Sequence, residues 1–180
     1  MIDPSAQPVG RPSSTASPAD FRALMAAFPT GVAILTTFGP DGEPKGMTCS
    51  SVCSVTLTPP VLLVCVRYGS PTLEAITRRL TFAVNLLHEG AADTAGLFAS
   101  GDPDRFDRVR WQAGPDAAGP HLIDDAHAVA HCRVVGTQAV GDHVIVLGEA
   151  GLIRQEARRD PLLYGLRRYA AWPAPLGAER

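Results

Sequence analysis

The chain has 180 residues, of which 46% are hydrophobic and 19% charged, a composition that suits one globular domain with a single substantial core. The formal net charge is −2 and the isoelectric point is near 6.2, which excludes a strongly basic surface for nucleic acid or an anionic membrane. Seventeen glycines and sixteen prolines favour a turn-rich β protein over a helical bundle.

The N-terminal segment 1–18 is rich in Pro, Ser and Ala and contains neither a secretory apolar segment nor a membrane span. We expect a flexible tail there, one domain over residues 19–173, and a second short tail over 174–180. The cysteines show no metal or redox spacing, which predicts free thiols in a reducing cytoplasm. They are Cys49, Cys53, Cys65 and Cys132.

The first half of the domain reads as a helix followed by strands. Ser17 and Pro18 are typical of a helix start, and apolar residues recur at helical spacing up to Phe28. A strand then runs to Phe38, and Asp41-Gly42 forms a hairpin turn. The second strand of that hairpin contains the stretch GMTCSSVCSVTLTPP, and the prolines at its end turn the chain into a third strand.

The second half continues the β pattern with short helices in the connections. No regular βαβ rhythm is present, so we expect a β-barrel with peripheral helices. The predicted elements are a helix capped by Ser70, a strand over 81–87, a helix over 91–99, a long loop over 99–120, strands over 128–139 and 143–153, and a C-terminal helix from Asp160 to just before Trp172.

Several common catalytic motifs are absent from the sequence. No glycine-rich phosphate loop of the G-x-G-x-x-G or G-x-x-x-x-G-K-[ST] type occurs, and no G-x-S-x-G elbow supports a serine nucleophile. His88-Glu89 lacks the second histidine of a helical zinc site. His127 and His131 are four residues apart on a predicted strand, which is too wide a separation for one metal ion.

The stretch from residue 46 to residue 60 has short hydroxyl side chains where a core strand would carry bulky ones. Exposed serines and threonines on one face are common in antiparallel strands, but here hydroxyls occupy both faces. Small side chains let a flat ligand approach the backbone, and Ser70 with Thr72 opens a helix whose N-terminus suits an anion. The residues therefore predict a ligand with a flat polar ring and a phosphate.

Gly141-Asp142-His143 is the other unusual motif. Turn chemistry explains Gly141 and Asp142 in a hairpin. It leaves His143 as an aromatic, hydrogen-bonding residue at the start of a strand, where it can contact a ligand at a barrel rim.

The chain resembles the flavin reductase family, the small reductases that supply reduced flavin to two-component monooxygenases. The resemblance runs in order from Asp20 to Trp172. It is carried by FPTGVAILTT, GMTCSSVCSVTLTPPVLLVCV, TFAVNLL, LFAS with DRFDRVRW, AHCRVVGTQAVGDHVIVLGEA and DPLLYGLRRY. It implies an NAD(P)H:flavin oxidoreductase with a split β-barrel, mainly β with peripheral helices. It also implies a homodimer with FMN or FAD near the dimer interface, NADH or NADPH as reductant, and a monooxygenase partner.

The resemblance also implies site residues, by position. His143 and Tyr169 match positions beside the nicotinamide nucleotide. No acid, base or metal ligand is implied, because hydride passes directly from nicotinamide to flavin. The positions that match flavin contacts are Thr30, Thr48, Cys49, Ser50, Ser51, Ser54, Ser70, Thr72, Asn85 and Phe106.

The sequence departs from the family pattern at several positions. Cys49 stands where Ala is frequent, Val52 stands where an aromatic residue is frequent, and Thr58 lies where Asp or Ser is frequent. The choice between FMN and FAD, and between NADH and NADPH, stays open.

Two alternative functions are compatible with the same barrel. One is a flavin-binding electron carrier or storage protein that does not oxidise NADH. The other is an enzyme like pyridoxamine phosphate oxidase, against which the Gly141-Asp142-His143 motif and the scarcity of lysines argue.

Overall fold

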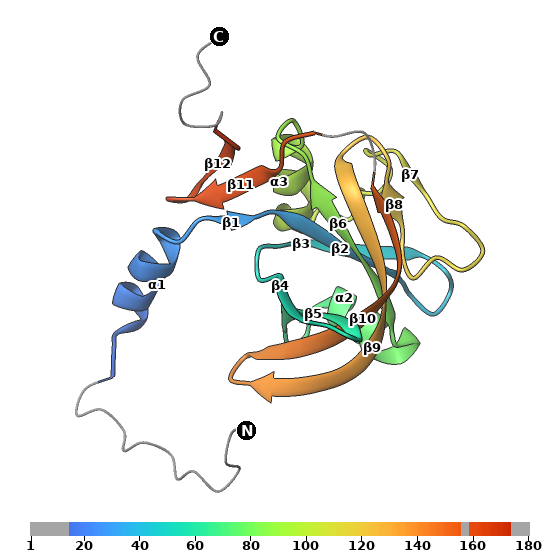
Figure 1. The fold of residues 1–180 in the computed structure, drawn as a ribbon, viewed down its shortest axis with the longest axis horizontal. Helices are drawn as coiled ribbons and strands as arrows, with labels where there is room; N and C mark the ends of the chain where they lie inside the picture. The colour runs from blue at the N-terminus through green and yellow to red at the C-terminus, as the bar shows by residue number, and fades with distance from the viewer. Residues whose placement is uncertain (1–14, 156–158, 174–180) are drawn as a thin grey trace, which may run out of the picture.

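The computed structural model describes residues 15–155 and 159–173 and has strands as its main elements (Figure 1). In chain order the elements are α1 (Pro18–Ala26), β1 (Thr30–Gly31), β2 (Ala33–Phe38), β3 (Pro44–Cys49), β4 (Cys53–Leu57), β5 (Pro60–Arg67), α2 (Pro71–Arg79), β6 (Thr81–Leu87), α3 (Ala92–Ser100), β7 (Trp111–Gln112), β8 (His121–Leu122), β9 (Ala126–Val140), β10 (His143–Gln155), β11 (Leu162–Gly165) and β12 (Arg168–Ala171). Among these residues, no helix is both long enough and apolar enough to cross a membrane.

Local sequence signals set the helix boundaries. The Ser17 hydroxyl accepts a hydrogen bond from the Asp20 N–H at 3.1 Å, and Pro18 occupies the first turn of α1. In the same way, the Ser70 hydroxyl accepts from the Leu73 N–H at 3.1 Å and caps α2. Both predicted caps are confirmed because each depends only on residues within one helical turn.

Seven strands form one antiparallel sheet in the order β3-β2-β6-β9-β10-β5-β4. β3 and β4 lie at opposite edges of this sheet, yet only residues 50–52 separate them in sequence. The sheet must therefore curl until its two edges approach each other, and the described strands leave the barrel open between β3 and β4 (Figure 1). The predicted split β-barrel is confirmed.

Two apolar clusters hold the barrel together. The first fills its interior with side chains of the inward strand faces, including Phe82, Val64 and Val146, and is covered by Ile76 of α2. The second lies outside the sheet, where Ile34 and Leu87 pack with Phe98 of α3. The members of both clusters are largely inaccessible to solvent, so burial of their apolar surface is the main stabilising contribution.

Asn85 of β6 connects the sheet to the loop before β8. Its side-chain amide donates to the Ile34 carbonyl, the Thr36 hydroxyl and the Pro120 carbonyl at 3.1–3.3 Å, and its oxygen accepts from the Leu122 N–H at 3.0 Å. Asn85 is fully buried, so these bonds satisfy every polar atom of its amide. The residue thus fixes the loop against β2.

The stretch predicted as one continuous strand breaks at residues 50–52. Cys49 is the last residue of β3 and pairs with Ala33, whereas Cys53 begins β4 and pairs with Leu63. The prediction of a single alternating strand is wrong here because the chain changes partners at opposite edges of the sheet. Periodicity alone does not reveal which partner a strand takes.

The predicted C-terminal helix is also wrong. Residues 162–171 form a hairpin, β11 and β12, and β11 pairs with β1 through Thr30↔Tyr164 and Gly31↔Leu163. The apolar residues of this segment fit helical and alternating spacing equally well. Pairing with a distant strand decides between the two, and this pairing is not visible in the local sequence.

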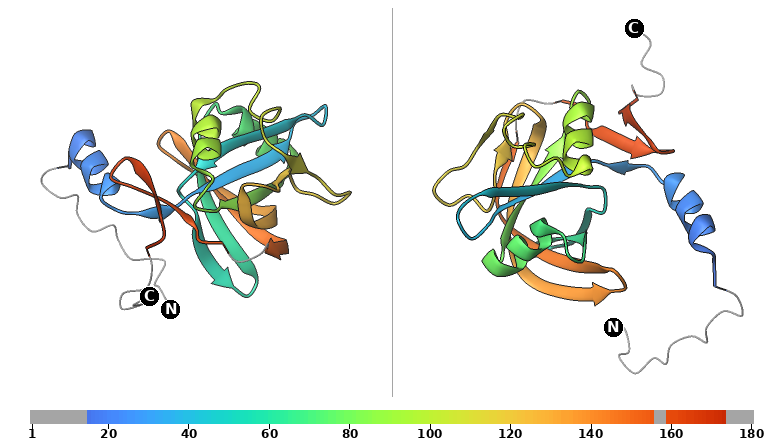
Figure 2. Two further views of the ribbon diagram at one scale, coloured as in Figure 1. Left: turned by 90° about the horizontal axis from the view of Figure 1, so that it is seen from above. Right: turned by 180° about the vertical axis from the view of Figure 1, so that it is seen from behind.

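α1 stands away from the barrel, on the side of the β11–β12 hairpin (Figures 1 and 2). Its predicted apolar face is present but exposed: Phe21, Leu24, Met25 and Phe28 keep between 46% and 65% of their surface. Residues 1–14 and 174–180 lie outside the described part of the chain, so most of the predicted tails does as well.

Replacing Asn85 by alanine should lower the free energy of unfolding by about 2–3 kcal/mol, because the buried Leu122 N–H and its neighbouring carbonyl groups lose their partner. Urea denaturation followed by circular dichroism measures this loss. Gln138→Ala, at an exposed position of β9, is the control and should change stability by less than about 0.5 kcal/mol. Equal losses in the two variants would contradict the role given to Asn85.

Candidate functional site

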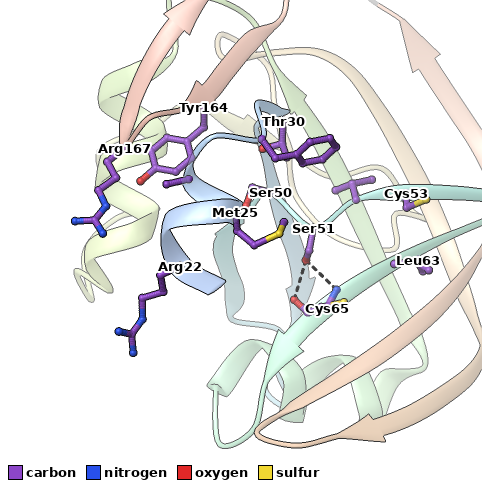
Figure 3. Close-up of a pocket in the computed structure, with 13 residues that line it drawn as sticks. Arg22, Met25, Thr30, Ser50, Ser51, Cys53, Leu63, Cys65, Tyr164 and Arg167 are labelled. Carbon is purple, nitrogen blue, oxygen red and sulfur yellow. Dashed lines mark hydrogen bonds between the residues drawn. The ribbon is translucent and has the colours of Figure 1, made fainter. Parts of the chain in front are cut away.

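A cleft of about 850 Å³ lies between α1 and the outer face of the barrel (Figure 3). Its volume suits a ligand the size of a nucleotide cofactor. α1, β1, the 50–52 connector, β5 and the β11–β12 turn all contribute side chains. The lining residues are Arg22, Met25, Ala26, Phe28, Thr30, Ser50, Ser51, Val52, Cys53, Leu63, Cys65, Tyr164 and Arg167.

Ser51 fixes the connector at the floor of the cleft. Its hydroxyl accepts from the Cys65 N–H at 3.0 Å and donates to the Cys65 carbonyl at 3.1 Å, so a side chain replaces the backbone pairing that a strand would make (Figure 3). Its remaining contact is with the Cys49 thiol at 3.2 Å. The single hydroxyl proton of Ser51 is already donated to the Cys65 carbonyl. The Cys49 S–H must therefore be the donor in the contact between the two side chains.

Burial keeps Cys49 in the form that this contact requires. Desolvation raises the pKa of the Cys49 thiol above its ordinary value, and the contacts of the sulfur with the Ser51 side chain and backbone oppose this only in part. The thiol therefore stays protonated at neutral pH and donates to Ser51. Cys49 supports the floor of the cleft from behind and does not line it.

Two hydroxyls at the cleft differ from Ser51 in having no hydrogen-bond partner in the described part of the chain. Thr30 Oγ1 is buried and makes no hydrogen bond within the described residues. Ser50 is exposed, and its hydroxyl makes none there either. A buried hydroxyl without a partner carries a desolvation cost, which a bound ligand can remove. Both groups are thus free to bind a polar ligand edge.

The backbone of the connector is also available. Residues 50–52 belong to neither β3 nor β4, so their N–H groups are not used by a strand ladder among the described residues. Small side chains at Ser50 and Ser51 leave this backbone accessible from the cleft. It offers fixed donors to the edge of a flat ring.

Tyr164 forms the wall of the cleft beside Thr30, its partner in the β1–β11 pairing. Its ring lies 5.3 Å from that of Tyr169 across the hairpin. Burial, and to a smaller extent Tyr164, raises the pKa of Tyr169, so its hydroxyl stays neutral. Tyr164 thus occupies the cleft, and Tyr169 supports it.

The structure brings together only part of the predicted flavin set. Thr30, Ser50 and Ser51 line the cleft, and Cys49 lies behind them. Thr48 donates to the Ala95 carbonyl at 2.6 Å, on the side of α3. Ser54 borders a separate apolar groove.

Four further predicted residues have structural contacts outside the cleft. Ser70 caps α2, and Thr72 is buried in its first turn. Asn85 holds the loop before β8. Phe106 packs edge-on against Phe98 at 5.0 Å in the outer apolar cluster. Nothing in their contacts directs these four side chains toward the cleft.

His143 lies at the start of β10, where it pairs with Arg67 of β5. Directly paired residues project to the same face of a sheet, as do residues two apart in a strand. His143 therefore shares the face of Cys65 and Leu63, although it does not itself line the cleft. Its Nδ1 contacts Asp142 Oδ1 at 2.8 Å, and this contact lowers the pKa of the Asp142 carboxyl.

Sequence reasoning missed the residues that come from α1 and from the C-terminal hairpin. Arg22, Met25, Tyr164 and Arg167 all line the cleft (Figure 3). The apolar spacing of α1 could have indicated a ligand-facing or partner-facing surface, but the same spacing is typical of a buried helix face. The sequence of the hairpin gave no indication of a cleft, because that segment was predicted as a helix.

Comparison with known proteins identifies the family. Residues 25–173 match the flavin reductase like domain family, which is most of the chain. The chain belongs to the flavin reductase family. This match includes the barrel, the C-terminal hairpin and the last residues of α1, so it covers every lining residue of the cleft except Arg22.

Individual flavin reductases are similar to this chain in sequence or in structure over nearly their full length. The flavin reductase (NADPH) of Lentzea aerocolonigenes is 48% identical over 90% of this chain and 94% of its own. The Streptomyces globisporus NADH:FAD oxidoreductase SgcE6, solved with NAD and FAD fragments, is 34% identical, with a TM-score of 0.82 over 93% of this chain and 100% of its own. The styrene monooxygenase flavin reductase of Pseudomonas putida S12 is 30% identical, with a TM-score of 0.78 over 86% and 99%.

The two neighbouring serines of this flavin reductase should differ in their contribution to stability. Ser51→Ala removes both hydrogen bonds to Cys65 and should lower the free energy of unfolding by about 1–2 kcal/mol. Ser50→Ala is the matched control and should change it by less than about 0.5 kcal/mol. Urea denaturation of both variants without ligand checks this. A larger loss for Ser50→Ala would contradict the assignment of the two hydroxyls.

Proposed function

We infer that the protein is an NAD(P)H-dependent flavin reductase whose cleft binds FMN or FAD. The observation that carries this inference is that the family match and the cleft involve the same part of the chain. One of the stretches that carry the resemblance to flavin reductases, residues 46–60, supplies the floor of the cleft. That floor consists of small side chains, accessible backbone and hydroxyls that have no partner among the described residues.

The residues present fit a flavin. The hydroxyls of Thr30 and Ser50, which have no hydrogen-bond partner among the described residues, and the backbone N–H groups of Ser50 and Val52 are suited to the polar edge of the ring. The apolar side chains of Met25, Leu63 and Val52 suit its flat faces. Each group would act from a position that the fold already fixes, so binding requires little reorganisation.

The chain itself contributes binding, orientation and electrostatics. When bound, the flavin and the nicotinamide nucleotide supply the redox chemistry, in which a hydride moves from the nicotinamide to the flavin ring. The connector N–H groups would stabilise negative charge at the ring edge. Tyr164 and Met25 would hold the rings at the short separation that transfer requires and exclude water from it. No side chain is assigned a proton transfer.

His143 is proposed to position the nicotinamide nucleotide. It lies on the same face of the sheet as Cys65 and Leu63 and keeps 46% of its side chain exposed, which leaves its ring open to a ligand. Asp142 holds that ring by a hydrogen bond at Nδ1, which leaves Nε2 without a partner among the described residues. Tyr169 would act at the same end of the site, through its contact with Tyr164.

We further propose a homodimer. Besides the apolar face of α1, the edge strand β4 exposes Val55 and Leu57, the latter at 83%. Exposed apolar surface on this scale is characteristic of interaction sites. A second copy that covers α1 and β4 would also close the cleft, which the single chain leaves open to solvent.

The remaining assignments follow from the relatives. A partner monooxygenase would receive the reduced flavin, as the name of the Pseudomonas putida relative suggests for that protein. The named relatives include an NADPH-dependent reductase and an NADH:FAD oxidoreductase, so either nucleotide is compatible. The four cysteines are free thiols and one of them is exposed, which suits the cytoplasm.

The purified protein should oxidise NADH or NADPH when FMN or FAD is added. The variant His143→Ala should raise the KM for the nicotinamide nucleotide about ten-fold, which corresponds to a loss of roughly 1.4 kcal/mol of binding free energy. The physical reason is the loss of a ring contact and not of a proton donor, so the Kd for flavin should hardly change. Steady-state absorbance of the nicotinamide and flavin fluorescence measure the two effects.

Gln138→Ala, an exposed position on the same hairpin, is the control for His143. Flavin binding without any nicotinamide oxidation by the unaltered protein would identify a flavin carrier or storage protein instead. A loss of flavin affinity in folded His143→Ala would place the residue at the flavin.

The protein should sediment at about twice its chain mass of 19.0 kDa. Leu24→Asp puts a charge in the exposed apolar face of α1 and should shift the dimer to a monomer. Ala23→Asp, on the opposite face of the same helix, is the matched control and should leave the mass unchanged. Sedimentation equilibrium measures both. A monomeric unaltered protein that reduces flavin would contradict the proposal.

A further inference from the structure

The cleft is positively charged in a protein that is slightly negative. Arg22 and Arg167 both line it, and no Asp or Glu is among its described lining residues. The whole chain, in contrast, has a formal net charge of −2. Since arginine keeps its charge at any physiological pH, the cleft presents two fixed positive charges to whatever enters it.

Neither arginine is neutralised by a carboxylate of the described residues. Elsewhere in the described structure, Arg108, Arg110 and Arg133 each form an ion pair with a carboxylate at 3.0 Å or less. Arg22 and Arg167 form no such pair among the described residues. Two cations that share one cavity repel each other, and a bound anion would turn this repulsion into attraction.

The two guanidinium groups come from separate elements but extend to the same side of the cleft. Arg22 projects from α1 and Arg167 from the β11–β12 turn, both away from the floor at Ser51 and Cys65 (Figure 3). Tyr164 lies beside Arg167. The cleft thus has two ends, one with small hydroxyls and free backbone, the other with two positive charges.

The turn that carries Arg167 has an unfavourable backbone for its sequence. Leu166 and Arg167 have φ values of 50° and 59°, the left-handed region, at the two central positions of a tight hairpin. Asn-Gly is preferred in such a turn because side chains with a full Cβ are strained there. Strained residues of this kind concentrate at functional sites. The strain is consistent with a functional requirement for the Arg167 side chain.

We propose that Arg22 and Arg167 form a clamp for a phosphate group of the bound nucleotide. Guanidinium forks bind phosphate oxygens in pairs, which gives both affinity and orientation. A ligand with a flat polar ring at one end and a phosphate at the other matches the two ends of the cleft. The proposal rests on the proposed function. The phosphate belongs either to the flavin or to the nicotinamide nucleotide.

The test compares R22A/R167A with R78A/R168A, which loses the same charge at exposed positions outside the cleft. Fluorescence titration gives the Kd for FMN and for riboflavin, which lacks the phosphate. Steady-state kinetics gives the KM for NADH and for NADPH. R22K/R167K keeps the charge without the fork and should fall between the double alanine variant and the unaltered protein.

Two results would support the clamp and identify the source of the phosphate. If the clamp binds the phosphate of the flavin, the Kd for FMN should rise at least ten-fold in R22A/R167A while the Kd for riboflavin is unchanged. If the clamp binds a phosphate of the nicotinamide nucleotide, the KM for that nucleotide should rise at least ten-fold in R22A/R167A, with kcat retained and FMN affinity unchanged. Changes no larger than those of R78A/R168A in all four measurements would overturn the proposal.

A change in the turn itself separates strain from function. L166N/R167G should raise the midpoint of thermal unfolding because it removes the strained backbone, and should weaken nucleotide binding as far as R167A does. Unchanged nucleotide binding in this variant would overturn the role of Arg167. The comparison of FMN with riboflavin needs no turnover, so a protein that fails to oxidise NAD(P)H would refute the proposed function and leave this test intact.

Discussion

The link between β3 and β4 is the constraint on which the rest of the structure depends. Three residues join strands that lie at opposite edges of a seven-stranded sheet. So short a connection forces the sheet to curl until its two edges approach. The connector begins with two small residues, Ser50 and Ser51, and Ser51 holds it on Cys65. The same features give the cleft a flat floor with accessible backbone.

Some polar side chains have their hydrogen-bonding atoms satisfied by other parts of the protein, and others have no such partner among the described residues. Ser51 and Asn85 have every hydrogen-bonding atom satisfied by protein partners, so they hold elements together. Among the described residues, the buried Thr30 hydroxyl has no partner, and Arg22 and Arg167 share a cavity that no carboxylate lines. A folded chain tolerates such unsatisfied groups at a cost in stability. Their gathering in one cleft is the physical signature of a binding site.

The sequence predictions failed where two structures share one pattern. The C-terminal segment has apolar residues that suit a helix or a hairpin, and only the edge offered by β1 decides in favour of strands. The break at residues 50–52 was hidden for a similar reason, because alternation continues through it while the partner strand changes. Asn85 and Phe106 differ from these cases, because their expected flavin contacts stay predictions; their contacts among the described residues lie in the barrel wall and in the outer apolar cluster.

The sequence by itself determined the features whose causes are local. The caps of α1 and α2 and the turn at Gly42 were predicted from neighbouring residues, and the flavin reductase family from a resemblance that runs along most of the chain. Only the tertiary structure decided which polar atoms remain free and that α1 and the C-terminal hairpin complete the cleft. Those facts depend on contacts between segments more than 100 residues apart, such as Thr30 with Tyr164. Spacing along one segment does not encode what a distant segment places beside it.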